Sequence, residues 1–223
     1  MQSITSISGG KSSAWMALSY PTDLYIFACV LIEDAACAPK DHEAYSCDIL
    51  PCSGGFPEWH IQDDVRNQLS SKWDLMIAHP PCTYLSISGM HWTTRGLRDI
   101  KLTDEALDFV RLLLEAPISR IALENPVSII SSRIRKPDQI IQPYDFGHDA
   151  SKKTCLWLKG LRPLCHTQYY PPRIVNGKKR WGNQTDSGQN RLGPSENRAG
   201  IRSLTYPNIA KAMADQWGKG EYN

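Results

Sequence analysis

Four short apolar runs, each ending at loop-forming or polar residues, constrain the fold of this chain more than any other feature of the sequence. They are Ser3 to Ser8, Leu24 to Ile32, Trp73 to Ala78 and Arg120 to Leu123. Runs of this kind are typical of parallel strands buried on both faces. Helical patterns cover Lys11 to Ser19, Thr103 to Ala116 and Asn208 to Trp217. The alternation predicts an α/β fold, a parallel sheet with helices on both faces.

The helical pattern from Thr103 to Ala116 is the strongest of the chain. One predicted face carries Ala106, Phe109, Val110 and Leu113. Asp104 and Glu105 are expected in the first turn, where the helix dipole favours negative charge. A fifth strand is predicted from Thr154 to Leu158, directly after the basic pair Lys152-Lys153.

Composition narrows the class of protein. The 223 residues suit one α/β domain of ordinary size, and 25 basic against 23 acidic residues exclude a strongly cationic coat. The longest apolar run has nine residues, too few to cross a bilayer, and the first ten residues lack the pattern of an export signal. Seven irregularly spaced cysteines without a Cys-x-x-Cys motif favour neither disulfides nor a metal site. We expect a cytoplasmic protein without metal or membrane.

The strand from Trp73 to Ala78 runs into His79-Pro80-Pro81-Cys82. Two prolines fix φ and remove two backbone donors, so the segment cannot continue the sheet. The thiol of Cys82 is therefore expected on a stiff loop, as a nucleophile requires. A small apolar residue in a proline-rich turn is the alternative.

The strand from Arg120 to Leu123 ends in a similar way, at Glu124-Asn125-Pro126. The crossover between the two strands, if right-handed, brings both strand ends to one edge. A helix N-cap or a surface carboxylate is the alternative for Glu124. A thiol and a carboxyl group on neighbouring strand ends are what covalent addition to a pyrimidine needs, one attacking carbon 6 and the other stabilising charge near nitrogen 3.

At these residues the sequence resembles the DNA (cytosine-5) methyltransferases. Pro80-Pro81-Cys82 and Glu124-Asn125-Pro126 are similar to the two catalytic motifs of that family, with closer likeness to short phage and prophage DNA cytosine methyltransferases. Similar segments, in family order, are Ser46 to Pro51, Ile77 to Leu85, Gln142 to His148, Lys153 to Leu158 and Thr205 to Ala214. The resemblance covers about residues 43–218. It implies a Rossmann-like S-adenosylmethionine-dependent methyltransferase sheet that acts on DNA, in a host cell if phage-encoded.

The resemblance also implies catalytic roles. Cys82, in the motif with Pro81, would be the nucleophile toward a cytosine that has left the duplex stack. Glu124 would contact ring nitrogen 3 and the exocyclic amine, while Asn125 and Pro126 would shape the pocket.

Further roles concern the cofactor and the nucleic acid. Asp48 would bind the ribose hydroxyls of S-adenosylmethionine. Asp64 would meet the adenine edge, with Asp63 as the near alternative. Lys152 and Lys153 stand where the family places arginines near the target base and phosphate.

The first strand-loop-helix unit of the family has no counterpart ahead of Asp48 and is atypical here. Residues 1–41 instead resemble the phosphoadenosine phosphosulfate reductase and ATP pyrophosphatase superfamily, through Ser8-Gly9-Gly10-Lys11-Ser12-Ser13. A glycine pair between strand and helix can present N–H groups to an anion, and a tight turn without ligand is the alternative. Either this unit, with Gly9 and Gly10, accepts the cofactor, or the cofactor site is broken and the protein binds DNA without methylating it.

The predicted organisation has four parts. Residues 1–41 form the pyrophosphate-loop-like unit, 42–160 the catalytic core, 161–204 a short basic loop region, and 205–223 a helix that returns to the core. We expect a monomer. Histidines 79 and 148 lie near the predicted site, but single histidines are usually structural.

The basic region 161–204 stands where larger relatives carry a target-recognition domain. Lys178-Lys179-Arg180-Trp181 sets an aromatic ring beside three cations, which could contact phosphates and stack a base. A solvated loop is the alternative. Arg191, in Gln189 to Gly193, could donate to guanine.

Overall fold

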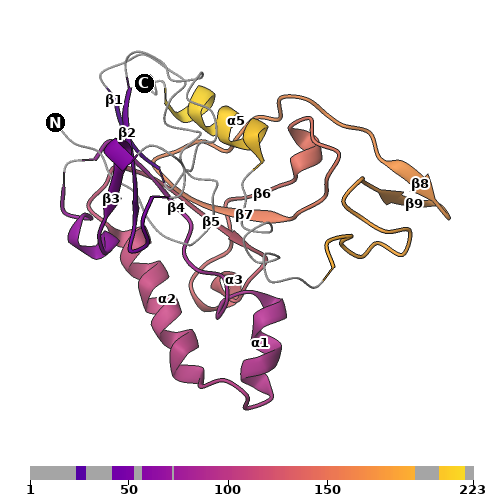
Figure 1. The fold of residues 1–223 in the computed structure, drawn as a ribbon, viewed down its shortest axis with the longest axis horizontal. Helices are drawn as coiled ribbons and strands as arrows, with labels where there is room; N and C mark the ends of the chain where they lie inside the picture. The colour runs from indigo at the N-terminus through magenta and orange to yellow at the C-terminus, as the bar shows by residue number, and fades with distance from the viewer. Residues whose placement is uncertain (1–23, 29–41, 53–56, 72, 194–205, 219–223) are drawn as a thin grey trace.

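The computed structural model describes residues 24–28, 42–52, 57–71, 73–193 and 206–218 (Figure 1). In this part of the chain the fold is mixed α/β, with a seven-stranded sheet, four α-helices and a separate two-stranded ribbon. The predicted strand from Ser3 to Ser8 and the helix from Lys11 to Ser19 lie outside the described residues, as do residues 29–32 of the second predicted strand.

The main sheet has the strand order β3-β2-β1-β4-β5-β7-β6. Its strands are β1 (Leu24–Ala28), β2 (His42–Asp48), β3 (His60–Gln62), β4 (Leu75–Ala78), β5 (Arg120–Pro126), β6 (Gln139–Ile141) and β7 (Thr154–Lys159). β1 to β5 are parallel to one another, whereas β7 is antiparallel to both β5 and β6. The order reverses between β1 and β4, where the chain crosses from one half of the sheet to the other.

Helices cover both faces of the sheet, as the strand–helix alternation predicts. α5 (Pro207–Trp217) lies on one face and α2 (Ile100–Glu115) on the other (Figure 1). β4 contributes to both cores: Leu75 and Ile77 pack in the core that contains α5, and Met76 and Ala78 in the core that contains α2. A strand covered on both faces has no solvent-facing positions, which is why its sequence is continuously apolar.

α2 begins earlier than the sequence suggests. The side chain of Asp99 caps it by accepting from the backbone N–H of Lys101 at 2.9 Å. Asp104 and Glu105 therefore lie in the second turn, and their predicted place in the first turn is wrong. A carboxylate does accept a hydrogen bond from the first turn of α2, but it belongs to the capping residue Asp99.

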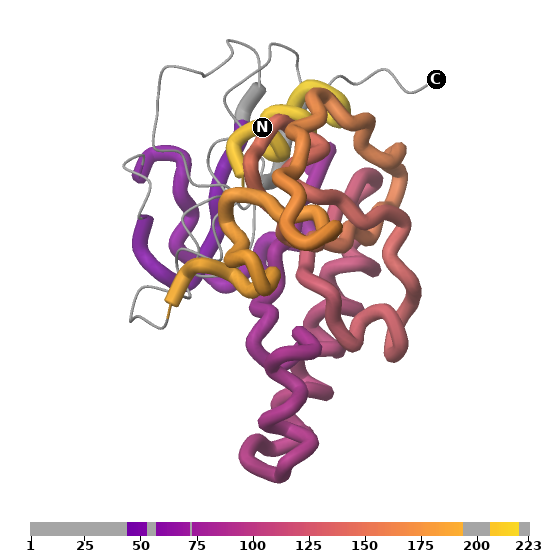
Figure 2. Tube along the Cα trace, turned by 90° about the vertical axis from the view of Figure 1, so that its right-hand side faces the viewer, coloured from indigo at the N-terminus to yellow at the C-terminus, as the bar shows by residue number. Residues whose placement is uncertain are grey.

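The other helices are short. They are α1 (Ile87–Thr94) and α3 (Ile130–Arg133), with 3-10 turns η3 (Pro57–Trp59), η4 (Val65–Asn67) and η5 (Pro143–Asp145). Figures 1 and 2 show α1 and the start of α2 projecting from the body on the side away from α5. α1 follows directly on the loop that contains Cys82, and Ser86 caps it by accepting from the N–H of Gly89.

Two strands differ from expectation. β5 does not end before Glu124 but continues to Pro126, because β7 pairs with it over that length even after β4 has ended. β7 covers the predicted fifth strand, but it runs antiparallel. The stretch between β6 and β7 contains no crossover helix, only η5, and a return without such a helix reverses the direction of the chain.

The basic region forms a hairpin that stands apart from the main sheet (Figure 1). β8 (Arg173–Val175) pairs antiparallel with β9 (Lys178–Arg180). The two turn residues, Asn176 and Gly177, have φ of 49° and 72°. Asparagine and glycine tolerate this left-handed conformation, which two-residue hairpin turns require.

Candidate active site

The two predicted motifs follow adjacent strands. β4 and β5 are parallel, and their register pairs Ala78 with Leu123. The residues that follow, His79 and Glu124, therefore start at the same level of the carboxyl edge of the sheet. Ligands of open α/β sheets bind beyond this edge.

A histidine to which the sequence assigns no function holds the side chain of Glu124. Nδ1 of His79 lies 2.9 Å from Oε2 of Glu124. The two side chains are only 10% and 19% exposed, so water screens the pair weakly. Nε2 of His79 is buried, and no group in the described part of the chain hydrogen-bonds to it.

The surroundings of Glu124 favour its ionised form. Burial alone would raise the pKa of this carboxyl group. Three neighbours outweigh this effect of burial: His79 through a hydrogen bond and its charge, Lys152 through its charge, and Thr154 through its hydroxyl. Together they lower the pKa of Glu124 below its ordinary value of 4.5. Near neutral pH the group is therefore a carboxylate, able only to accept hydrogen bonds.

Asn125 ties the second motif to the first. Its side chain, 1% exposed, donates from Nδ2 to the carbonyl of Pro80 at 2.9 Å. Pro80 and Pro81 have no N–H groups of their own, so the loop before Cys82 depends on acceptors such as this carbonyl. Asn125 thus holds the cysteine-bearing loop against the end of β5.

The turn that begins at Cys82 is anchored to the same segment. The carbonyl of Cys82 accepts from the N–H of Ser86 at 2.9 Å. Ser86 and Ser128 form an isolated antiparallel bridge, and the N–H of Ile129 donates to the carbonyl of Leu85 at 3.0 Å. The loop that carries the thiol is therefore fixed on both sides by residues that follow β5.

The Asn125 bond leads to a testable prediction. Asn125→Ala leaves the buried carbonyl of Pro80 without this donor, and we expect unfolding free energy to fall by about 1–3 kcal/mol in urea titrations. The control is Asn67→Ala, which removes an exposed side-chain hydrogen bond to Asp63. Equal stability of the two variants would mean that Asn125 does not hold the loop.

The thiol of Cys82 differs in setting from the buried cysteines. Cys82 is exposed, whereas Cys47 and Cys155 are buried. Burial is the main reason why the pKa of Cys47 rises to about 12, and burial followed by the charge of Glu124 raises the pKa of Cys155. Those two thiols stay protonated and unreactive. The accessible cysteine at the carboxyl edge of β4 is Cys82.

Asp48 lies at the same edge, at the end of β2. Oδ1 of Asp48 accepts from the N–H of Leu50 at 2.9 Å, and its carbonyl accepts from the N–H of Asp63 at 3.1 Å. Because β2, β1, β4 and β5 are parallel, this edge is shared with Cys82 and Glu124. The structure thus places Asp48, the predicted ribose-binding residue, at the carboxyl edge of the sheet and beside the acids that follow β3.

The two acids after β3 are engaged by their own neighbours. Asp63 accepts from the side chains of Asn67 and Gln68, which, in that order, lower its pKa. Asp64 caps η4 and pairs with Arg66 at 2.7 Å, and hydrogen bonding to Arg66 lowers its pKa. Both carboxylates therefore serve local structure. Gly9 and Gly10, predicted to cradle an anion, lie outside the described residues.

The charge of Lys152 acts on Glu124, and that of Lys153 acts on the neighbouring Cys155. The charge of Lys152 contributes to the low pKa of Glu124, and its Nζ lies 6.0 Å from the ring centre of Tyr206. Lys153 is exposed at the start of β7, and its charge acts on the buried Cys155. The two lysines therefore differ in exposure and in the group on which their charge acts.

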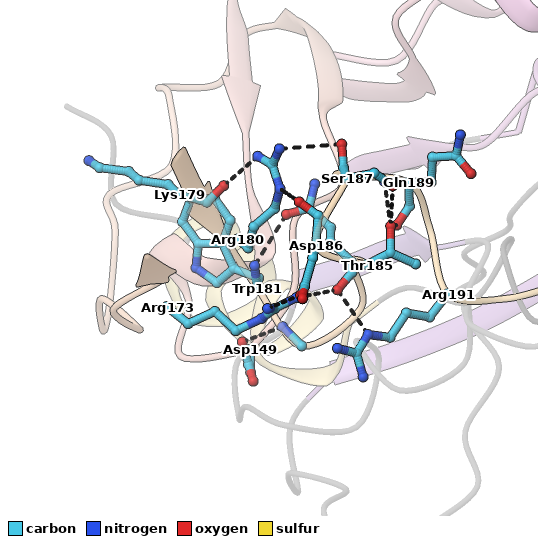
Figure 3. A network of polar contacts seen from close by, with 12 residues as sticks. Asp149, Arg173, Lys179, Arg180, Trp181, Thr185, Asp186, Ser187, Gln189 and Arg191 are labelled. Carbon is cyan, nitrogen blue, oxygen red and sulfur yellow. Dashed lines mark hydrogen bonds and ion pairs between the residues drawn. The ribbon is translucent and has the colours of Figure 1, made fainter. Parts of the chain in front are cut away.

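Two predicted DNA contacts, Arg180 and Arg191, hold a loop together (Figure 3). The guanidinium of Arg180 donates to the carbonyls of Asp186 and Ser187 at 3.1 and 3.3 Å. Nε of Arg191 donates to the carbonyl of Gln184 at 2.8 Å. Part of the donor capacity of both arginines is thus used to fix the loop beside the hairpin.

Trp181 is not available to stack a base. Its ring is 7% exposed and stacks on Tyr144, with ring centres 4.0 Å apart and planes at 9°. Its Nε1 donates to the carbonyl of Tyr170 at 3.2 Å. By contrast, the exposed Lys179 extends away from the polar network (Figure 3). The hairpin therefore offers cations to solvent but not the tryptophan.

The described residues contain neither a metal site nor a membrane-spanning helix. Within the described ranges, no three His, Cys, Asp or Glu residues gather as a metal site. No helix in the part of the chain that the structure covers is both long and apolar enough to traverse a bilayer. Comparison with protein-family models and with curated proteins finds no match to this chain.

Proposed function

We propose that the protein is a DNA (cytosine-5) methyltransferase that uses S-adenosylmethionine. The observation that carries the proposal is the joining of the Cys82 loop to the end of β5 by the Asn125–Pro80 hydrogen bond, next to the partly buried, ionised Glu124. The order of the first five strands, 3-2-1-4-5, is also that of a doubly wound Rossmann sheet.

The chemistry assigned to each side chain follows from its setting. A cytosine must first leave the duplex stack, which costs a few kcal/mol. The thiolate of Cys82 then forms a bond to carbon 6, which makes carbon 5 nucleophilic. Glu124, as an acceptor, binds the exocyclic amine and stabilises a proton on ring nitrogen 3. Once carbon 5 carries the methyl group, its proton passes to water. The electrons of that C–H bond re-form the C5–C6 double bond as Cys82 leaves as a thiolate, and nitrogen 3 returns the proton that it took from water, which restores the free enzyme.

The acids at the ends of β2 and β3 fit the proposed cofactor chemically. Ribose hydroxyls and an adenine amine are donors, and ionised carboxylates are acceptors. Asp48 would bind the ribose, and Asp64 or Asp63 the adenine. When bound, S-adenosylmethionine supplies the methyl group that carbon 5 receives.

Methyl transfer itself is the direct test. The full chain is incubated with duplex DNA of random sequence and S-adenosylmethionine labelled with tritium in the methyl group. We expect label in 5-methyldeoxycytidine after digestion of the DNA. No label in cytosine above a protein-free control would overturn the proposal.

A DNA-binding protein without methyl transfer is the second candidate. It is favoured by the side-chain contacts of the two acids after β3: Asp63 accepts hydrogen bonds and Asp64 forms an ion pair with residues of this chain, without any cofactor. This alternative predicts salt-dependent DNA binding and no heat of binding for S-adenosylmethionine in calorimetry. A micromolar dissociation constant for S-adenosylmethionine would discard it.

The hairpin gives a prediction about DNA affinity. Lys179 is exposed on a ribbon narrow enough for the major groove. If it neutralises a phosphate, Lys179→Ala should reduce the slope of log affinity against log salt by about 1, measured by fluorescence anisotropy. The control is Lys101→Ala, an exposed lysine on α2. An unchanged slope in Lys179→Ala would contradict this role.

A further inference from the structure

His79 makes a contact that the two sequence motifs do not explain. It lies between the end of β4 and Pro80, and its partner Glu124 is 45 residues away in the chain. A histidine that only filled space would not need to direct Nδ1 at a partly buried carboxylate. Because both side chains are shielded from water, the contact fixes the orientation of each.

The other groups that face Glu124 act on it through different interactions from that of His79. From the loop before β7, Lys152 contributes charge, and from β7 itself Thr154 contributes a hydroxyl hydrogen bond. Cys155, also on β7, is a buried thiol whose pKa is raised first by burial and then by Glu124.

We propose that His79 is a positioning residue, which fixes Oε2 of Glu124 so that the carboxylate presents constant acceptor atoms to the target base. This inference rests on the proposed function, because it assigns the base as the group that Glu124 meets. His79 need not touch the base; it acts through Glu124. Without it, the carboxylate can rotate and loses the ring nitrogen that lies 2.9 Å from Oε2.

Two variants separate positioning from packing. His79→Ala removes the donor, and we expect kcat for methyl transfer to fall by about 10–100-fold with an unchanged KM for S-adenosylmethionine. His79→Asn keeps a neutral N–H donor near the place of Nδ1, and should recover most of that loss. Urea unfolding of both variants shows whether they fold. A folded His79→Asn no more active than His79→Ala would overturn the proposal.

A double-mutant cycle with Glu124→Gln tests the route of the effect. If His79 acts through Glu124, adding His79→Ala to Glu124→Gln should change kcat by less than about threefold. Independent effects would instead multiply, as expected for a merely structural residue. Multiplication would overturn the proposal.

The pair can also be measured without any activity. Carbon-13 NMR of the Glu124 carboxyl group follows its protonation in wild type and His79→Ala. His79 lowers the pKa of Glu124 by hydrogen bond and charge, so the variant should take up its proton at higher pH. Glu115, exposed at the end of α2, is the control and should not change. Identical Glu124 titrations would overturn the proposal.

The two proposals can fail separately. If the loss of His79 raises the pH at which Glu124 takes up its proton, but the wild-type protein transfers no methyl group, the proposed function is rejected. The positioning role is then rejected with it, whereas the contact between His79 and Glu124 stands. Active wild type with a fully active His79→Ala variant rejects the positioning role alone.

Discussion

Cys82→Ala is expected to abolish methyl transfer while leaving the fold and DNA binding unchanged. The thiol is exposed, and in the proposed mechanism it makes the bond to carbon 6, for which alanine offers no nucleophile. The anchors of the loop are backbone groups and the Asn125 side chain, so they survive the change. We expect the rate to fall at least about 10³-fold, as for other covalent nucleophiles.

Covalent trapping measures this prediction directly. In duplex DNA with 5-fluorocytosine, fluorine replaces the proton that must leave carbon 5, so the adduct cannot resolve after methylation. Wild type should form a complex that survives denaturing electrophoresis, and Cys82→Ala should not. Cys165→Ala removes another exposed thiol and is the matched control. A trapped complex in Cys82→Ala would reject Cys82 as the nucleophile.

Glu124→Gln is expected to have the next largest effect, a fall in kcat of about 10²–10⁴-fold. The amide is close in shape, and its carbonyl can still accept from Nδ1 of His79, so the fold should remain intact. It has no negative charge to stabilise a proton on ring nitrogen 3. Its NH₂ group can also face the exocyclic amine of cytosine, donor against donor.

Steady-state methylation assays separate this effect from binding. We expect a smaller change in DNA affinity than in kcat, because contacts to the DNA backbone do not involve Glu124, whereas the step that charges the ring needs the carboxylate. Glu115→Gln removes an exposed carboxylate at the end of α2 and should behave as wild type. If Glu124→Gln keeps kcat within about threefold of wild type, Glu124 takes no part in catalysis.

The strands that the sequence predicts well are the buried ones. β4 and β7 are covered on both faces, so an unbroken apolar run marks each of them. β3 and β6 lie at the two edges of the sheet and are only three residues long, His-Ile-Gln and Gln-Ile-Ile. Their pairing comes from neighbouring strands rather than from their own composition, and no local pattern indicates it.

The hairpin could have been predicted. Asn176-Gly177 between two short runs is a strong sequence signal for a two-residue turn. The roles of its cations could not, because Arg180 and Arg191 bind carbonyls of a loop that folds back onto them. Charge alone predicts a DNA contact, and tertiary contacts divide the cations into those that hold the loop and those, such as Lys179, that face solvent.

By itself the sequence determined the α/β class, the helices from about residue 103 and residue 208, and the two motifs at strand ends, because apolar periodicity and proline stops are local properties. Only the tertiary structure decided that β5 extends through Glu124-Asn125-Pro126, that Trp181 is buried, and that His79 meets Glu124. Such pairings depend on the register between strands distant in the chain, and register is set by the packing of the whole sheet.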